Sequence, residues 1–229
     1  MNSDVAIGDL SGREGLAGAM GWRIGAAAAL VVFMAVLGAV SASAEAESAP
    51  GEIVRFSVIG ELPREPFAAD EFRQVGVTDD AVAQITRGVV PSRSLTLAAP
   101  KADPNNPYQI VATWNDNTGK ALSMRWGSPS WGWLKVSNKH NLTTAAARTT
   151  TKHPESRVVE SPSAIRYRTP VHRVECAVGR IGCRIVETRT VRVIANPIRL
   201  TDGKAKGVIT AYCEGVTWCP NWVKNAVNA

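Results

Sequence analysis

Three residues have types and spacing that suit acid–base chemistry: His140, and the hydroxyl residues Thr210 and Tyr212 nearer the C-terminus. His140 follows Lys139 at the end of the segment WGWLKVSNKH, and the positive charge of Lys139 is expected to lower the imidazole pKa if the two are close. Histidine is the usual proton donor or acceptor near neutral pH. Thr210 and Tyr212 alternate in the segment GVITAY, so a strand places both on one face. The alternative is that His140 is a half-buried structural side chain bonded to a backbone carbonyl.

Arginines accompany these residues in the predicted strands of the C-terminal part. The guanidinium group binds phosphate through two parallel hydrogen bonds and can stabilise charge that develops on it. We single out Arg168, Arg189 and Arg192 as candidates for such a clamp and expect the other strand arginines on a solvated face. Of the remaining histidines, His172 is expected on the covered side of a strand and His153 on the surface.

The sequence lacks the other common catalytic signatures. It contains no Walker-type phosphate loop, no G-x-S-x-G nucleophile elbow, no H-E-x-x-H metal motif and no paired acidic motif. Cleavage of RNA by its own 2′-hydroxyl needs only a base, an acid and cations near the phosphate, without a metal or a protein nucleophile. His140 would serve as base or acid, the arginines as the clamp, and Tyr212 or Thr210 as orienting hydroxyls. No metal and no cofactor are expected.

All four cysteines lie in the last third of the chain: Cys176, Cys183, Cys213 and Cys219. An even number of cysteines in an exported chain predicts two disulfide bonds, for which three pairings are open. We favour Cys176 with Cys183, because the intervening AVGRIG resembles a hairpin turn, and Cys213 with Cys219, which would close the final loop. A zinc site is the alternative, but the spacings C-x6-C and C-x5-C depart from the usual C-x2–4-C.

Residues 24–40 form an apolar run of 17 positions without a charge. Arg13 and Arg23 precede the run, and the small residues Ala42-Ser43-Ala44 follow it, which is the pattern of a secretory signal peptide cleaved after Ala44. The alternative is an uncleaved membrane anchor, although 17 helical residues span only roughly 25 Å of a bilayer core of about 30 Å. Both interpretations predict that the rest of the chain is secreted or lies in the cell envelope.

Positive charge is concentrated at the C-terminal end. Residues 145–229 contain 14 Lys and Arg and six Asp and Glu, a net charge of +8, whereas residues 1–44 and residues 45–144 each sum to −1. Such a field favours a polyanionic partner, which could be nucleic acid, anionic lipid or a wall polymer. A solubilising surface is the alternative.

The pattern of helices, strands and turns predicts an α+β fold in three segments. Residues 1–44 are the signal peptide or anchor, residues 45–107 form an extended lead with a strand at EIVRFSVIG and two short helices, and residues 108–229 form a C-terminal domain.

In the C-terminal domain, YQIVATW and KALSMRW should form a hairpin around NDNTG, followed by a helix from Pro129 to Asn141 with Ser128 as its cap. Four strands then follow: AIRYRT, VHRVECAV, CRIVETRTVRVIANPI and KGVITAYC. They are separated by Pro170 and by two turns, and they predict an antiparallel four-stranded meander. The core-facing residues of the last strand are expected to be Ile209, Ala211 and Cys213.

The segment from Trp131 to Cys213 resembles the secreted ribonuclease toxins of the superfamily that contains barnase, EndoU, colicin D and RelE. The features that carry the resemblance are helices before a four-stranded meander, the GWLKVSNKH segment, and the closing GVITAY strand. The resemblance implies that His140, Thr210 and Tyr212 are functional together with strand arginines. It also implies RNA as substrate and an acidic immunity protein as partner.

Two classes of function follow from these observations. The first is an exported, disulfide-stabilised, metal-independent endoribonuclease. The second is a non-enzymatic secreted or cell-envelope binding protein that uses its basic face to hold an anionic polymer. Tryptophans could also stack sugars in a carbohydrate-binding protein, with Trp114, Trp126, Trp131 and Trp133 as candidates. An enzyme requires that His140, Thr210, Tyr212 and at least one arginine converge on one surface.

Overall fold

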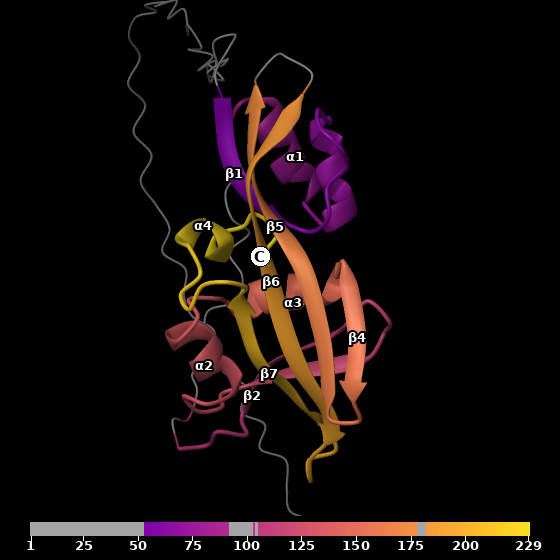
Figure 1. Ribbon diagram of the computed structural model, residues 1–229, viewed down its shortest axis with the longest axis vertical. Coiled ribbons are helices and arrows are strands. Elements are labelled where there is room, and N and C mark those ends of the chain that lie inside the picture. Colours follow the sequence, from indigo (N-terminus) through magenta and orange to yellow (C-terminus); the bar gives the residue numbers. More distant parts are fainter. Residues whose placement is uncertain (1–52, 92–102, 104, 178–181) are drawn as a thin grey trace, which may run out of the picture. The chain divides into compact units, whose positions relative to one another are not determined.

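The chain forms an α+β unit built on a curled antiparallel sheet with few helices (Figure 1). The computed structural model describes residues 53–91, 103, 105–177 and 182–229. In chain order the elements are β1 (Ile53–Ile59), the 3-10 helix η1 (Ala69–Val75), α1 (Asp79–Thr86), β2 (Ile110–Asn115), β3 (Ala121–Arg125), α2 (Gly132–Asn138), α3 (Thr144–Lys152), β4 (Ser156–Ser161), β5 (Ala164–Ala177), β6 (Cys183–Arg199), β7 (Ala205–Cys213) and α4 (Asn221–Lys224).

Strand β5 is the axis of the main sheet. It pairs with β6 along one edge, and β6 pairs in turn with β7. On its other edge β5 carries two strands end to end: β4 pairs with residues 164–168 and β1 with residues 171–177. The sheet therefore has five strands, one more than predicted. β1, which comes from the segment predicted as an extended lead, is one of these strands.

Pro170 does not end a strand, and this prediction was wrong. β5 continues through it, because the ring nitrogen lies where no ladder hydrogen bond is needed. Pro170 O accepts from Gly60 N at 2.9 Å, and in a strand the nitrogen of a residue points to the same side as its carbonyl. That side is the junction where the pairs to β4 stop at Arg168 and the pairs to β1 start at Val171, so the missing N–H removes no bond to β6. The short edge strand β4 was not predicted at all.

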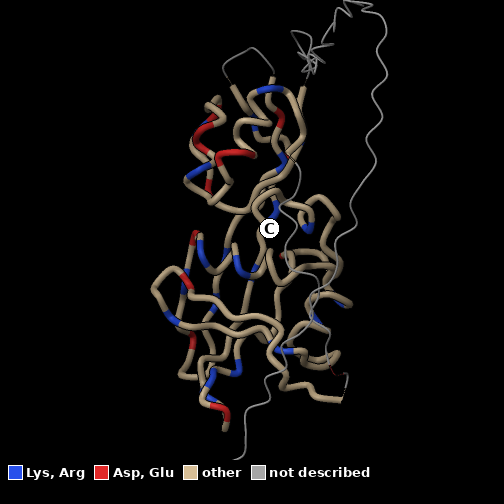
Figure 2. The backbone as a smooth tube through the Cα atoms, turned by 180° about the vertical axis from the view of Figure 1, so that it is seen from behind, with Lys and Arg blue, Asp and Glu red and all other residues tan. Residues whose placement is uncertain are grey.

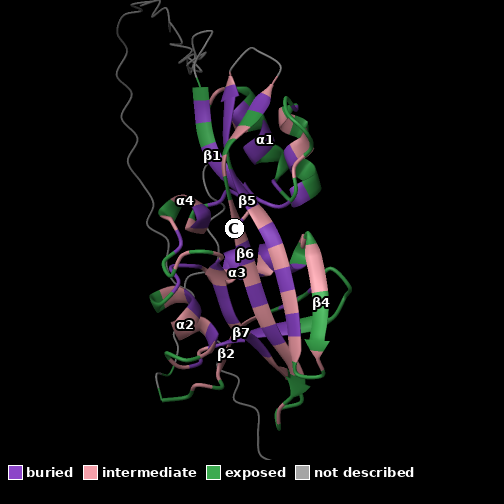
Figure 3. Ribbon diagram, viewed as in Figure 1, coloured by how far each residue is buried: buried purple, intermediate pink, exposed green. Residues whose placement is uncertain are grey.

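The sheet packs one core on each of its two faces. Tyr167 and Val171 point to the first core, under the β2–β3 hairpin, α2 and α3. Side chains alternate between the two faces along a strand, so the even-numbered Val174 and Cys176 of β5 point to the opposite side, into the second core under η1 and α1. We call the two sides of the sheet the Tyr167 face and the Arg168 face. Figure 3 shows the resulting alternation of buried and half-buried positions along β5 and β6.

Caps explain where the helices begin. Thr78 caps α1: its hydroxyl accepts from Ala81 N at 3.3 Å. Helix α2, predicted to start at Pro129, starts at Gly132, because the Ser128 hydroxyl bonds to Ser130 within a turn and caps no helix. α2 also ends earlier than predicted, at Asn138.

Two disulfide bonds join the cysteines in the favoured pairing, Cys176 with Cys183 and Cys213 with Cys219. No cysteine is left as a thiolate ligand for zinc, and no group of three or more His, Cys, Asp or Glu suited to a metal ion occurs in the described residues. The two bonds fit an oxidising environment. The predicted signal or anchor at residues 24–40 lies outside the described residues. Among the described helices, none has the length and apolar character needed to cross a bilayer.

Charge divides by region within the unit. Acidic residues occupy the first turns of η1 and α1, and Figure 2 shows these red positions close together, while blue positions follow the strands. The basic character of the C-terminal end is thus carried largely by the sheet.

Candidate active site

Tyr212 lies between a histidine and an arginine on the Arg168 face. Arg192 of β6 is directly opposite Tyr212 of β7. Its Nη1 donates to the Tyr212 hydroxyl at 3.2 Å, and its guanidinium carbon lies 5.8 Å from the centre of the Tyr212 ring. On the other side, the centroid of the His140 ring is 5.6 Å from that of Tyr212. The structure thus brings together three of the predicted site residues.

Glu214 extends this group, and the sequence interpretation missed it. Its carboxylate accepts from Arg192 Nε at 2.8 Å and from Nε and Nη2 of Arg168, both at 2.9 Å. Arg168 is the β5 residue opposite Arg192, so one carboxylate holds arginines from two neighbouring strands. The signal was present in the sequence, since Glu214 follows Tyr212 at period two. We call His140, Tyr212, Arg192, Glu214 and Arg168 the site cluster.

The loop closed by Cys213 and Cys219 holds His140 in place. His140 lies just past the end of α2 and is 8% exposed. Its Nδ1 is 3.0 Å from Thr217 O, so Nδ1 carries the hydrogen, and Nε2 of the neutral ring keeps its lone pair. The backbone is held as well: Cys219 N donates to His140 O at 3.1 Å, and Asn141 Nδ2 donates to Cys219 O at 2.8 Å.

Two groups of the cluster, His140 and Glu214, have lowered pKa values. Burial lowers the pKa of His140, the Thr217 carbonyl opposes this, and the positive charges of Lys135 and Lys139 add to the lowering. The direction is the one expected from Lys139, although burial is the larger cause. The hydrogen bonds from Arg168 and the charge of Arg192 hold the pKa of Glu214 below its usual value. Near neutral pH the cluster therefore combines a neutral imidazole with an ionised carboxylate.

Thr210 lies on the same face as Tyr212, one pleat away. A bulge at Ile209 separates the pairs of Ile194 with Thr210 and Ala195 with Val208. The core-facing residues of β7 are therefore Val208, Ala211 and Cys213, which corrects the expected set that included Ile209. Within the described part of the chain, the buried Thr210 hydroxyl has no hydrogen-bond partner.

Arg189 is not brought to the site cluster. It shares the parity of Val191, which is buried in the first core, and so lies on the Tyr167 face. Its nearest carboxylate is Glu187, at 3.8 Å. His172 is covered, as expected, with Nδ1 2.9 Å from the Thr188 hydroxyl. His153 differs from its expectation, because it is half-buried at the end of α3.

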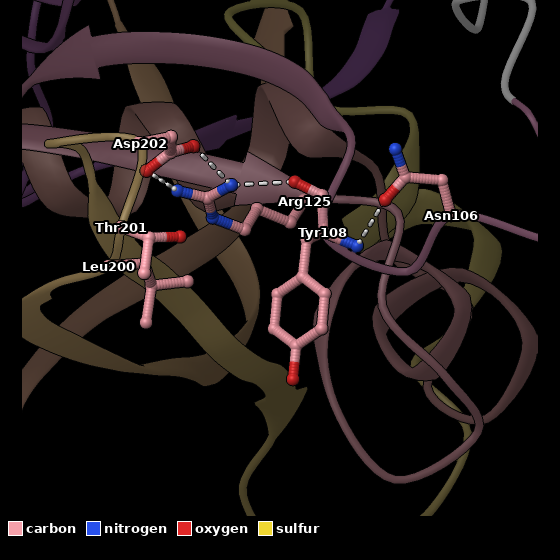
Figure 4. A pocket seen from close by; sticks show the side chains of 6 residues that line it. All are labelled: Asn106, Tyr108, Arg125, Leu200, Thr201 and Asp202. Carbon is pink, nitrogen blue, oxygen red and sulfur yellow. Dashed lines mark hydrogen bonds and ion pairs between the residues drawn. The ribbon is translucent and has the colours of Figure 1, made fainter.

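The hollow drawn in Figure 4 lies where the segment before β2, the end of β3 and the turn before β7 meet. It has a volume of about 500 Å³ and is lined by Asn106, Tyr108, Arg125, Leu200, Thr201 and Asp202. Arg125 is 1% exposed; it forms an ion pair with Asp202 at 2.9 Å and donates to the carbonyls of Tyr108 and Ala205. Its donors are used within the fold, so this guanidinium joins the turn before β7 to β3.

The tryptophans proposed for sugar stacking are largely occupied by contacts within the protein. Trp114 is buried and donates to the Thr151 hydroxyl at 2.7 Å. Trp126 and Trp133 stack on each other with 4.6 Å between ring centroids. Trp131 packs against Tyr108, with Lys206 Nζ 5.2 Å from its ring. The four rings therefore do not form a continuous stacking platform.

No family model, curated protein or solved structure matches the chain. The functional argument therefore rests on the geometry of the site cluster. A neutral imidazole, a carboxylate, a phenol and two guanidinium groups share one face of the sheet, and together they can move a proton and stabilise negative charge.

Proposed function

We propose that the protein is an exported, metal-independent endoribonuclease. The observation that carries the proposal is the convergence of His140, Tyr212, Arg192, Glu214 and Arg168 on one face. The five residues come from four segments that are far apart in the sequence: the end of α2, β5, β6, and the end of β7. The site cluster contains each kind of group that attack by a 2′-hydroxyl requires.

In this mechanism the 2′-oxygen of RNA forms a bond to the adjacent phosphorus, and the bond to the 5′-oxygen breaks. One group accepts the 2′-hydroxyl proton and another delivers a proton to the leaving oxygen, which yields a 2′,3′-cyclic phosphate and a 5′-hydroxyl end. Glu214, ionised near neutral pH, accepts the 2′-hydroxyl proton, and the protonated fraction of His140 delivers a proton to the leaving 5′-oxygen. Arg168 and Arg192 stabilise charge on the pentacoordinate phosphorus, and Tyr212, held by Arg192, orients the substrate.

The family assignment is part of the proposal. Consecutive antiparallel pairing of β4 with β5, β5 with β6 and β6 with β7 supports an equivalence with the four-stranded meander of the secreted ribonuclease toxins. β1 and the two disulfide bonds are then additions to that plan. An acidic immunity protein that covers the Arg168 face would be the natural inhibitor, because the C-terminal segment is strongly basic.

Export is proposed through residues 1–44, which act as a cleaved signal peptide or, uncleaved, as a membrane anchor through residues 24–40. The disulfide bonds support a secreted or cell-envelope location.

The decisive experiment is cleavage of fluorescent RNA in EDTA by the oxidised 45–229 protein. We expect cleavage to be lost in His140→Gln, whose side-chain amide can still donate to Thr217 O but cannot take up a proton. Matched circular dichroism and melting curves control for folding. A DNA oligonucleotide of the same sequence should remain intact, because it lacks the 2′-hydroxyl; its cleavage would contradict the mechanism.

Failure of the unmodified protein to cut RNA would overturn the proposal in favour of the binding protein. RNA affinity should in that case fall steeply with salt, because phosphate contacts release counterions.

A further inference from the structure

The Tyr167 face carries a second group of charged residues beyond the first core. There, β1, β5 and β6 place Arg55, Glu175 and Arg184 in one cross-strand row, with Arg173 and Glu187 paired in the adjacent region of β5 and β6. Parity puts this row on the side opposite Val54, Val174 and Cys183 of the second core. The full set has a net charge of +2 and consists of Arg55, Arg173, Arg184, Arg189, Glu175 and Glu187.

The two glutamates do not neutralise their arginines equally. Glu175 accepts hydrogen bonds from both Arg55 and Arg184. Arg173 and Arg189, in contrast, each approach Glu187 only to 3.8 Å, which is too long for a hydrogen bond. These longer pairs leave donor capacity for an external oxyanion.

A hollow of about 240 Å³ opens beside this group, lined in part by Arg55, Arg173, Trp222, Val90 and Pro91. Its wall is fixed to the sheet, because the Ser57 hydroxyl donates to Trp222 O and Val227 N donates to Ser57 O. The short helix α4 is thereby anchored on β1, with the indole and the two guanidinium groups around one space. None of the residues that line it is a histidine.

We infer that this hollow, the Arg55–Arg173 hollow, binds a phosphodiester of single-stranded RNA with a neighbouring base on Trp222. Guanidinium forks match phosphate oxygens, and aromatic rings beside a positive surface are how single strands are held without sequence readout. With no histidine in its lining, the hollow binds without cutting. Its position on the Tyr167 face separates it from the site cluster. The choice of RNA as the polymer rests on the proposed function.

Binding is best measured on the full oxidised 45–229 protein with His140→Ala in EDTA, so that the result does not depend on whether the unmodified protein cleaves RNA. The probe is a fluorescent single-stranded RNA. We expect the pair Arg55→Gln and Arg173→Gln to weaken affinity roughly tenfold or more, since each substitution removes charge-assisted hydrogen bonds to phosphate. The slope of log affinity against log salt should become shallower by about 1.4 for two lost contacts.

The matched control is Arg64→Gln with Arg73→Gln, which removes the same charge from exposed positions around η1. Equal weakening in both pairs would show a general effect of charge and would overturn the site. Should the first pair fail to fold, Arg55→Lys with Arg173→Lys keeps the charge but removes the forks, and unchanged RNA affinity would again overturn it.

The variant Trp222→Leu tests whether the bound phosphate belongs to RNA or to a phosphate polymer without bases. We expect RNA affinity to fall several-fold while affinity for inorganic polyphosphate, which has no bases, stays the same. An unchanged RNA affinity would overturn the assignment to RNA and favour a phosphate polymer without bases.

Discussion

Glu175 lies in β5 and Glu214 follows directly after β7, and each holds two arginines from different strands, but their surroundings differ. Beside Glu214, β7 presents Tyr212, and the end of α2 presents His140. Beside Glu175 the neighbours are further charged residues of β1, β5 and β6. In our proposals, the region around Glu175 binds an anion without reaction, whereas the region around Glu214 also transfers protons, because a separate element delivers a histidine there.

The sharpest way to break this comparison is to neutralise each glutamate. We expect Glu214→Gln to lower kcat/KM for a dinucleotide by about 100-fold, since acid–base groups contribute factors of roughly 10² to 10⁴. Glu175→Gln should leave this rate unchanged, because a single phosphodiester cannot occupy both faces of the sheet. Equal losses from the two substitutions would show that the faces are not functionally distinct.

The two disulfide bonds allow a matched test of how His140 is held. Replacing either pair by serine should cost about 2–3 kcal/mol of unfolding free energy, because the loops have similar lengths, with separations of seven and six residues. Only Cys213→Ser with Cys219→Ser should also lower RNA cleavage at a temperature where both variants are folded. Denaturant melts and cleavage rates on the same samples measure both effects. An active Cys213/Cys219 variant would contradict the positioning role.

Arg168 and Arg189 test the assignment of faces. Arg168→Gln should reduce dinucleotide cleavage roughly tenfold through loss of a charged hydrogen-bonding partner, while Arg189→Gln should not change it. Steady-state kinetics on the two single variants provide the measurement. An equally large loss of cleavage in Arg189→Gln and in Arg168→Gln would show that the face of the sheet does not decide which arginines take part in cleavage.

The smallest expected effect is on stability in mild acid. Burial lowers the pKa of His140, His153 and His172 from the ordinary value of 6.5, so the unfolded chain binds these protons more strongly than the folded one. The contribution to stability is complete above pH 6.5 and is lost as the pH falls through the lowered values. We expect Tm to decrease from pH 7.5 to pH 5.5, and His140→Gln to reduce the difference. A constant Tm over this range would contradict the buried, neutral state.

Local chemistry made part of the fold predictable. The β2–β3 hairpin and the favoured disulfide pairing follow from turns and spacings within a few residues, and both are confirmed. Pro170 misled the interpretation. A proline can lie inside β5 only because β4 and β1, which come from distant parts of the chain, meet end to end beside it. Such a junction leaves no mark in the local sequence.

The candidate site shows the same limit. Tyr212, Arg168 and Arg192 could be named from residue type, but their convergence depends on strand register. The bulge at Ile209 changed which residues of β7 face the core. The alternation of side chains along β6 places Arg189 and Arg192 on opposite faces of the sheet. Glu214 follows Tyr212 at period two, but it was missed because a carboxylate next to a cysteine carries no distinctive motif beyond that spacing.

A chain that still has free thiols at Cys213 and Cys219 lacks the covalent closure of the loop that holds His140. Such a chain is what a ribosome delivers into a reducing cytoplasm, where structural disulfides rarely form. We expect the catalytic geometry to be completed only after passage into an oxidising compartment. Synthesis and competence would then be separated in time, and the RNA of the producing cell would be spared while the protein is being made.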